Sequence, residues 1–187
     1  MATSLEKALV YHCAPALAGI KPSNLANCLL SRYPDCHEEI SELNRILNGK
    51  GIYFKPLFEC KRRVLLLVYR SSCLEKHLQD QEIQAYLHSI GYPPSGSLDE
   101  TLVHLGKRIA ESSNFPHEIG LFLGYPIEDV LDFLWHGGKN YKLCGYWKVY
   151  SNEKHAKKIF SKYTKCRDAF CSRLEHHQSI AKLLGSA

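Results

Sequence analysis

Hydrophobic positions recur along the chain at two spacings, and these spacings predict a mixture of helices and strands. Apolar residues three or four positions apart indicate helices that bury one face, whereas short continuous apolar runs indicate strands buried on both faces. The predicted helices are residues 3–10, 25–30, 37–47, 72–79, 80–90, 97–109, 127–135 and a long segment that begins after residue 152. The predicted strands are residues 52–58, 63–69, 118–124 and 143–150.

The apolar run at residues 118–124 has the pattern of a central strand. Ile119, Leu121 and Leu123 would lie on one face, and the residues between them are apolar as well. His117 comes directly before this run, so rigid backbone would hold its imidazole at the edge of a cleft. A general base needs such a placement. The alternative is a structural histidine whose ring nitrogens bond to neighbouring backbone groups.

Together these elements predict an α+β (mixed α/β) protein with a four- to five-stranded sheet covered by helices. The 187 residues are enough for one sizeable core, so we expect a single domain that covers residues 1–187. An apolar content of 45% and a charged content of 23% are ordinary for a soluble globular protein. The chain has no run of about 20 apolar residues and no secretory signal. We therefore expect a cytoplasmic protein that does not bind a membrane.

Cysteine usage predicts reduced thiols rather than disulfides or a metal centre. The eight cysteines are Cys13, Cys28, Cys36, Cys60, Cys73, Cys144, Cys166 and Cys171. They are scattered without any Cys-x-x-Cys motif, and a chain of this size folds without disulfide bonds. We therefore expect no metal and no cofactor.

The formal net charge is +5, and much of the excess lies in the predicted final helix. The basic residues there are Lys154, Lys157, Lys158, Lys162, Lys165 and Arg167. These residues predict either a solvated helix face or a docking surface for an acidic partner. Nucleic acid is not expected as a partner, because no aromatic residues alternate with the basic ones and no nucleic-acid-binding motif is present.

Cys13 is the candidate nucleophile. It lies in the segment Tyr11-His-Cys-Ala-Pro15, and a proline two positions later suits the first turn of a helix. A thiol at a helix N-terminus has a stabilised thiolate, because backbone N–H groups and the helix dipole point toward it. The alternative is that Cys13 is a small buried apolar residue and that its small neighbours indicate tight packing. If Cys13 and His117 meet in the fold, they form a nucleophile and its base.

Two segments resemble papain-like cysteine peptidases. The segment Cys13-Ala-Pro-Ala-Leu-Ala-Gly-Ile20 resembles the nucleophile segment of that superfamily, especially in the leader-peptidase domains of peptide exporters. The segment His117-Glu-Ile-Gly-Leu-Phe-Leu-Gly-Tyr125 resembles its histidine strand. This resemblance implies a papain-like fold in which Cys13 attacks a carbonyl and His117 takes its proton. The glutamine that papain-like enzymes place before the cysteine has no counterpart in residues 5–10.

The order of the superfamily implies a third residue after the histidine that orients the imidazole. Asn152 is the first choice, and Asn140 and Asp129 are the alternatives. Tyr125, His12 and Tyr146 are the candidate substrate-binding residues. For the two tyrosines, core packing is the alternative.

Over nearly its full length, the chain is similar to an uncharacterised family from anaerobic spore-forming bacteria. Its members have segments similar to Tyr11-His-Cys-Ala-Pro15, His117-Glu-Ile-Gly-Leu-Phe-Leu-Gly-Tyr-Pro126 and Gly145-Tyr-Trp-Lys-Val-Tyr150. That family brings no established activity, so the catalytic hypothesis depends on the papain-like resemblance alone.

The resulting hypothesis is cysteine-dependent acyl transfer through a thioester acyl-enzyme, to an amine or to water. The substrate would be an acyl or peptide-like molecule, which an acidic carrier protein could present to the basic final helix. One rival is a non-enzymatic redox or metal-handling protein, in which His12, Cys13, His117 and Cys144 would be ligands. The other rival is a protein-binding module.

Overall fold

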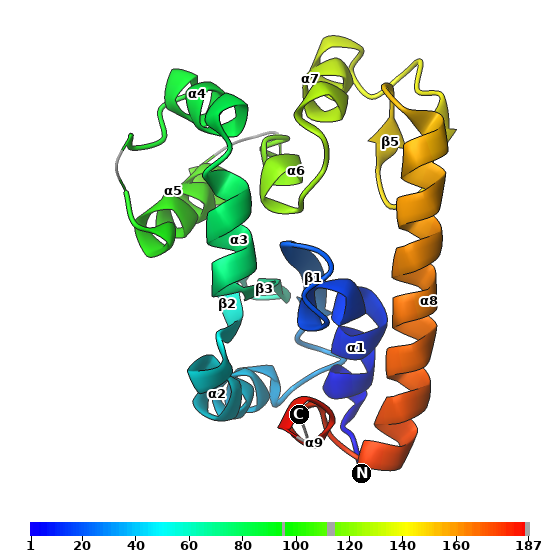
Figure 1. Cartoon of the computed structure of the whole chain (residues 1–187). Coiled ribbons are helices and arrows are strands. Elements are labelled where there is room, and N and C mark those ends of the chain that lie inside the picture. The colour runs from blue at the N-terminus through cyan, green and yellow to red at the C-terminus, as the bar shows by residue number, and fades with distance from the viewer. Residues whose placement is uncertain (95, 112–114, 186–187) are drawn as a thin grey trace.

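The computed structural model describes residues 1–94, 96–111 and 115–185, and it has helices on both faces of a small antiparallel sheet (Figure 1). In chain order the elements are α1 (Ser4–Leu17), β1 (Ser23–Leu29), α2 (Cys36–Leu47), η1 (Asn48–Lys50), β2 (Ile52–Cys60), β3 (Arg63–Arg70), α3 (Ser71–Leu78), α4 (Gln81–Ser89), α5 (Leu98–Glu111), α6 (Ile119–Phe122), α7 (Ile127–Trp135), β4 (Leu143–Cys144), β5 (Lys148–Val149), α8 (Glu153–His177) and α9 (Ile180–Gly185). No helix in these three ranges is both long enough and apolar enough to cross a bilayer.

The sheet has the strand order β1-β3-β2, and both pairings are antiparallel. Its central strand, β3, is buried along the whole apolar run from Val64 to Tyr69. Because successive side chains of a strand point to opposite faces, this one strand contributes to two cores. Val64, Leu66 and Val68 join the first core, whereas Leu67 and Tyr69 join the second.

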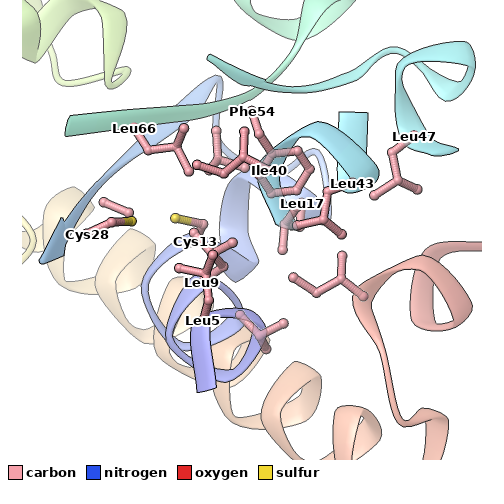
Figure 2. Close-up of a cluster of buried hydrophobic side chains, with 14 of the residues drawn as sticks. Leu5, Leu9, Cys13, Leu17, Cys28, Ile40, Leu43, Leu47, Phe54 and Leu66 are labelled. Atoms are coloured by element: carbon pink, nitrogen blue, oxygen red, sulfur yellow. The ribbon is translucent and has the colours of Figure 1, made fainter. Parts of the chain in front are cut away.

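The first core lies between the sheet and helices α1, α2 and α9. Each of these helices presents one apolar face to the sheet, as expected for surface helices. Figure 2 shows this cluster, including Leu5, Leu9, Cys13, Leu17, Cys28, Ile40, Leu43, Leu47, Phe54 and Leu66.

The second core covers the opposite face of the sheet and contains residues of α3 to α7. Helix α5 lies directly on β2, and a glycine makes this approach feasible. A Cβ atom at Gly106 would lie 2.7 Å from the carbonyl oxygen of Leu57, closer than packed atoms tolerate. Residues of α6 and α7 also belong to the second core, so both helices lie on this face of the sheet.

A third, smaller cluster joins the β4–β5 hairpin to the long helix α8. Trp147 and Val149 of the hairpin pack against Ala156 and Tyr163 of α8. Further along, α8 packs against α1 (Figure 1). The long helix thus supports the hairpin at one end of the molecule, next to α7 (Figure 1).

Much of the predicted secondary structure is confirmed. The strand pair at residues 52–58 and 63–69 corresponds to β2 and β3, and the helix at 127–135 matches α7 at both ends. The α+β class is confirmed as well. One sheet of four to five strands is wrong for the described residues, because β4 and β5 pair only with each other.

The predicted strand at residues 118–124 is wrong, because this run contains helix α6 followed by a tight turn. All four residues of α6 are buried, so the run is apolar on every side without being a strand. Gly124 adopts a φ of 73°, and the N–H of Tyr125 donates to the carbonyl of Gly120 at 2.9 Å. Gly124 allows the chain to reverse where a strand would have continued.

The predicted helix at residues 25–30 is also wrong, because residues 23–29 form strand β1 and pair with β3. Ser23 and Asn24 do not cap a helix. The Ser23 hydroxyl donates to the Phe122 carbonyl (2.8 Å), and the Asn24 side chain accepts from the Ala16 backbone N–H (3.2 Å). Both are long-range contacts that the local sequence pattern does not encode.

Two further elements differ from the prediction in length. Helix α1 does not end at residue 10 but continues through Pro15 to Leu17, so Cys13 lies inside a helix rather than at its N-terminus. The predicted strand at 143–150 is two short strands joined by a turn at residues 145–147. The aromatic and β-branched residues of this segment are typical of strands, but Gly145 begins a turn that divides the segment into two.

Candidate functional site

A pocket of about 290 Å³ lies between α6, α7 and the β4–β5 hairpin. It is open to solvent on one side, and most of its wall is apolar. Its lining residues are His117, Ile119, Gly120, Tyr125, Asp129, Val130, Phe133, Cys144, Gly145, Trp147 and Lys148. Pockets of this kind, apolar with a few convergent polar groups, are the usual sites of ligand binding.

Stacked aromatic rings form one wall of the pocket. The rings of Tyr125 and Trp147 are nearly parallel, with 5.1 Å between their centroids. The Tyr125 hydroxyl donates to the backbone carbonyl of Tyr146 (3.0 Å), which fixes the ring against the hairpin. Phe160 of α8 meets the indole edge-on at 4.6 Å and supports it from behind. These contacts make the wall rigid before any ligand binds.

Asp129 holds the hairpin against α7. Its side chain is buried, with 1% of its surface exposed. One carboxylate oxygen accepts from the Trp147 indole N–H (2.7 Å), and the other accepts from the backbone N–H groups of Tyr150 (2.8 Å) and Ser151 (2.7 Å). Three donors compensate the buried charge, so this carboxylate has a structural role.

Three polar side chains lie at the mouth of the pocket. His117 and Cys144 are both exposed, and the His117 ring lies 4.9 Å from the ring of Phe133. The Lys148 ammonium donates to the carbonyl of Gly138 (2.7 Å) and lies 5.6 Å from the centre of the Phe133 ring. The mouth therefore combines an imidazole, a thiol and an ammonium above an apolar interior.

The structure places Cys13 away from this pocket. The side chain is 0% exposed inside the first core, and Figure 2 shows its sulfur directed toward Cys28 of β1. Burial raises the pKa of the Cys13 thiol to about 12, although the nearby Lys21 ammonium lowers it in part. The expected pair of Cys13 and His117 is therefore not brought together, and a neutral, buried thiol is a poor nucleophile.

The three candidates for the orienting residue also have other roles. Asn152 caps α8, where its side chain accepts from the backbone N–H of His155 (2.9 Å). Asn140 is exposed in a turn with a φ of 61°. Asp129 lines the pocket, but its oxygens are occupied as described above. None of the three hydrogen-bonds to His117 within the described part of the chain.

The predicted substrate-binding residues are separated in the structure. Tyr125 lines the pocket, and its role in substrate binding stays a prediction. Tyr146 points to α8 instead, where its hydroxyl shares a hydrogen bond with Thr164 (3.2 Å). His12 is exposed on α1 beside Tyr11 and lies at a different, smaller depression near Cys28. Across the described ranges, no three residues among His, Cys, Asp and Glu gather closely enough to hold a metal ion.

Lys21 is a buried charged residue that no sequence pattern marked as a candidate. Its side chain is 3% exposed, and its ammonium lies 5.3 Å from the Tyr125 ring and 5.9 Å from the Tyr163 ring. Burial lowers the pKa of Lys21 to about 8, and the Cys13 thiolate form would raise it. Only contacts between distant segments create this environment, so no local pattern could have revealed it.

Comparison with known proteins identifies the family. Residues 9–184 match the family described as "Protein of unknown function (DUF3793)", and the chain therefore belongs to it. No curated protein and no solved structure shows a significant match. The papain-like arrangement expected from two local segments consequently stays a prediction.

The structure predicts an order of thiol reactivity. Cys60 is exposed at the β2–β3 turn, and the backbone N–H groups of Arg62 and Arg63 lower the pKa of its thiol. Cys60 should therefore react first with iodoacetamide near pH 7, whereas Cys13 should stay unmodified in the native protein. Peptide mass spectrometry at timed intervals measures both rates. Protein in guanidinium serves as the control, since all eight cysteines should then react. Labelling of native Cys13 as fast as Cys60 would contradict the order.

Lys21 should make stability depend on pH. Its pKa is about 8 in the folded state against an ordinary value of 10.5, so the unfolded chain holds the proton between these values. The free energy of unfolding due to this group therefore rises with pH in that window and is lowest below it. Lys21→Met removes the free-energy cost of burying a charged ammonium. The variant should therefore be more stable than the wild type at about pH 7, by on the order of 2–3 kcal/mol.

Urea unfolding at about pH 7 and about pH 9.5 measures the effect, and the advantage of Lys21→Met should shrink at the higher pH. The buried thiol of Cys13 and the hydroxyl of Tyr125, whose pKa values are raised to about 12, oppose this trend. Both groups are present in the variant and in the wild type, so comparison of the two isolates Lys21. Lys76→Met, at an exposed position, is the control. A variant less stable than wild type at about pH 7 would contradict the prediction.

Proposed function

We propose that this member of the DUF3793 family binds a small, flat, apolar molecule with one anionic group, in the pocket between α6, α7 and the β4–β5 hairpin. The observation that carries this proposal is the division of the pocket into an apolar interior and a mouth with two basic side chains, His117 and Lys148. A ring system would occupy the interior, and its acidic group would stay at the mouth.

The size of the pocket supports a ligand of one or two rings. Its volume is about 290 Å³. An apolar protein cavity of about 150 Å³ accommodates benzene. The pocket of this protein is larger than that cavity by a factor of about two and is open on one side, so a bicyclic aromatic acid fits its dimensions. The flat wall of Tyr125 and Trp147 favours planar ligands over bulky ones.

The charges of the pocket support an anion. An ammonium group has three N–H donors, and Lys148 uses one of them for the carbonyl of Gly138. Both carboxylate oxygens of Asp129 accept hydrogen bonds from Trp147, Tyr150 and Ser151, so this carboxylate is engaged with the hairpin rather than with Lys148. The remaining donors of Lys148, together with the imidazole of His117, are complementary to a carboxylate.

A second candidate function keeps the acyl transfer expected from the sequence but assigns the thiol to Cys144. The observation that favours it is that Cys144 and His117 line the same pocket and are both exposed. The Cys144 sulfur would attack the carbonyl of a thioester while His117 takes the thiol proton and returns it to the departing thiolate, and an amine or water would then take the acyl group from Cys144. Intact-mass detection of an acyl adduct that Cys144→Ser abolishes would support this candidate, and an unmodified Cys144 would leave binding alone.

Ligand binding can be tested with naphthoate and its neutral counterpart naphthamide. We expect naphthoate to bind more tightly, because only naphthoate offers a charge to Lys148. Lys148→Met should weaken naphthoate binding by about tenfold or more, the usual effect of losing a charged hydrogen bond. Isothermal titration calorimetry measures each affinity.

Lys142→Met is the matched control. Lys142 is also in the hairpin segment and also donates to a backbone carbonyl, that of Ser151 (3.0 Å), but it does not line the pocket. This variant should bind naphthoate like the wild type. Equal affinity of the wild type for naphthoate and naphthamide would contradict the anionic part of the proposal. Binding of neither compound, in protein whose fold is intact by circular dichroism, would contradict the proposal as a whole.

A further inference from the structure

Helix α7 is apolar on two adjoining faces, and only one of them is covered. Val130 and Phe133 face the pocket. On the other side, Leu131 and Leu134 are each 40% exposed and Trp135 is 86% exposed. A helix that is apolar around most of its circumference is normally buried, so the outer face of α7 is a candidate binding surface.

The exposed apolar residues continue beyond the end of α7. Tyr141 in the following loop is 43% exposed, and we name the set of Leu131, Leu134, Trp135 and Tyr141 the α7 tip. At 86% exposure, Trp135 projects from the protein rather than lying in a groove. Figure 1 shows the C-terminal end of α7, the following loop and the start of α8 at the same end of the molecule.

The segment that follows α7 is basic, although Glu128 and Asp132 of α7 itself are acidic. Residues 136–158 contain six lysines but only one acidic residue, Glu153. That acid is paired with Lys157. Lys139 is exposed in the loop beside Tyr141, and Lys154 is exposed at the start of α8. An anionic partner is therefore complementary to this end of the molecule.

The sequence gives no sign of membrane binding, but the exposed residues of α7 lead to a different expectation. We propose that the α7 tip docks on the surface of a bilayer that contains anionic lipids. Trp and Tyr side chains prefer the boundary between headgroups and acyl chains, and leucines add apolar contact there. Each lysine near an anionic surface contributes about 1 kcal/mol. The tip projects and is flanked by lysines such as Lys139 and Lys154, its basic rim, so it can insert between lipid headgroups, which move apart to admit it. Two copies of the chain would bring their basic rims together, which disfavours self-association through this surface.

This inference does not depend on the proposed ligand. Val130 and Phe133 line the pocket, whereas Trp135 does not line it and projects into solvent. Trp135→Ser should therefore leave naphthoate binding unchanged, and the failure of either proposal would leave the other intact.

The experiment uses vesicles of phosphatidylcholine, with or without about 30% phosphatidylserine. The full chain should sediment with the anionic vesicles at low salt, and the association should fall as salt rises. Trp135 is a built-in reporter, because the other tryptophan, Trp147, is already buried. The fluorescence of Trp135 should shift to shorter wavelength when vesicles are added, because the indole moves from water into the lipid interface. Trp135→Ser should weaken binding by at least about tenfold, and Lys139→Glu should weaken it to a smaller degree.

Val103→Ser is the matched control, since Val103 is also apolar and 44% exposed but lies on α5. It should bind vesicles like the wild type. No binding of the folded protein to anionic vesicles would overturn the proposal, as would equal binding of Trp135→Ser. Two other outcomes would also overturn it: a dimer in light scattering that Trp135→Ser abolishes, or crosslinking of the tip to an acidic protein in place of lipid.

Discussion

The buried carboxylate of Asp129 is the interaction on which the candidate site depends. Taking a carboxylate out of water costs several kcal/mol, and the structure offsets this cost with three donors from the hairpin and from the residues before α8. A two-stranded hairpin is not stable by itself in water. The bonds to Asp129 hold it against α7, and the space left between them is the pocket. Fold and site are therefore linked through one side chain.

Local sequence patterns correctly predicted the helices and strands whose buried residues recur at regular spacing. The alternating burial of β3 and the apolar face of helices such as α2 and α7 follow from residue spacing, so these elements and the α+β class were predictable. Two residues selected from the sequence, His117 and Tyr125, line the same pocket, and their functional roles stay predictions.

The rest of the site depends on contacts between distant segments, which a single sequence does not encode. Cys13 has small neighbours and a proline that suit a helix start, but α1 continues through Pro15 and buries the thiol against Cys28. The run after His117 is apolar on every side because α6 is enclosed by the second core, a pattern that a buried strand would share. Lys21, Cys144 and Lys148 have no local signature, because only the packing of the hairpin and of the loop before β1 gives them their surroundings.

The exchange rate of the Trp147 indole proton tests most directly whether Asp129 holds the hairpin in place. This proton is bonded to Asp129 and buried, whereas the indole of Trp135 is exposed, so the two signals differ in an NMR spectrum recorded after transfer to deuterated water. Asp132→Asn, one turn along α7, is the control and should leave exchange at Trp147 slow. Asp129→Asn leaves at least one donor unpaired, so exchange at Trp147 should become at least about tenfold faster and naphthoate binding should be lost. A slowly exchanging Trp147 proton and an unchanged pocket in Asp129→Asn would contradict the account.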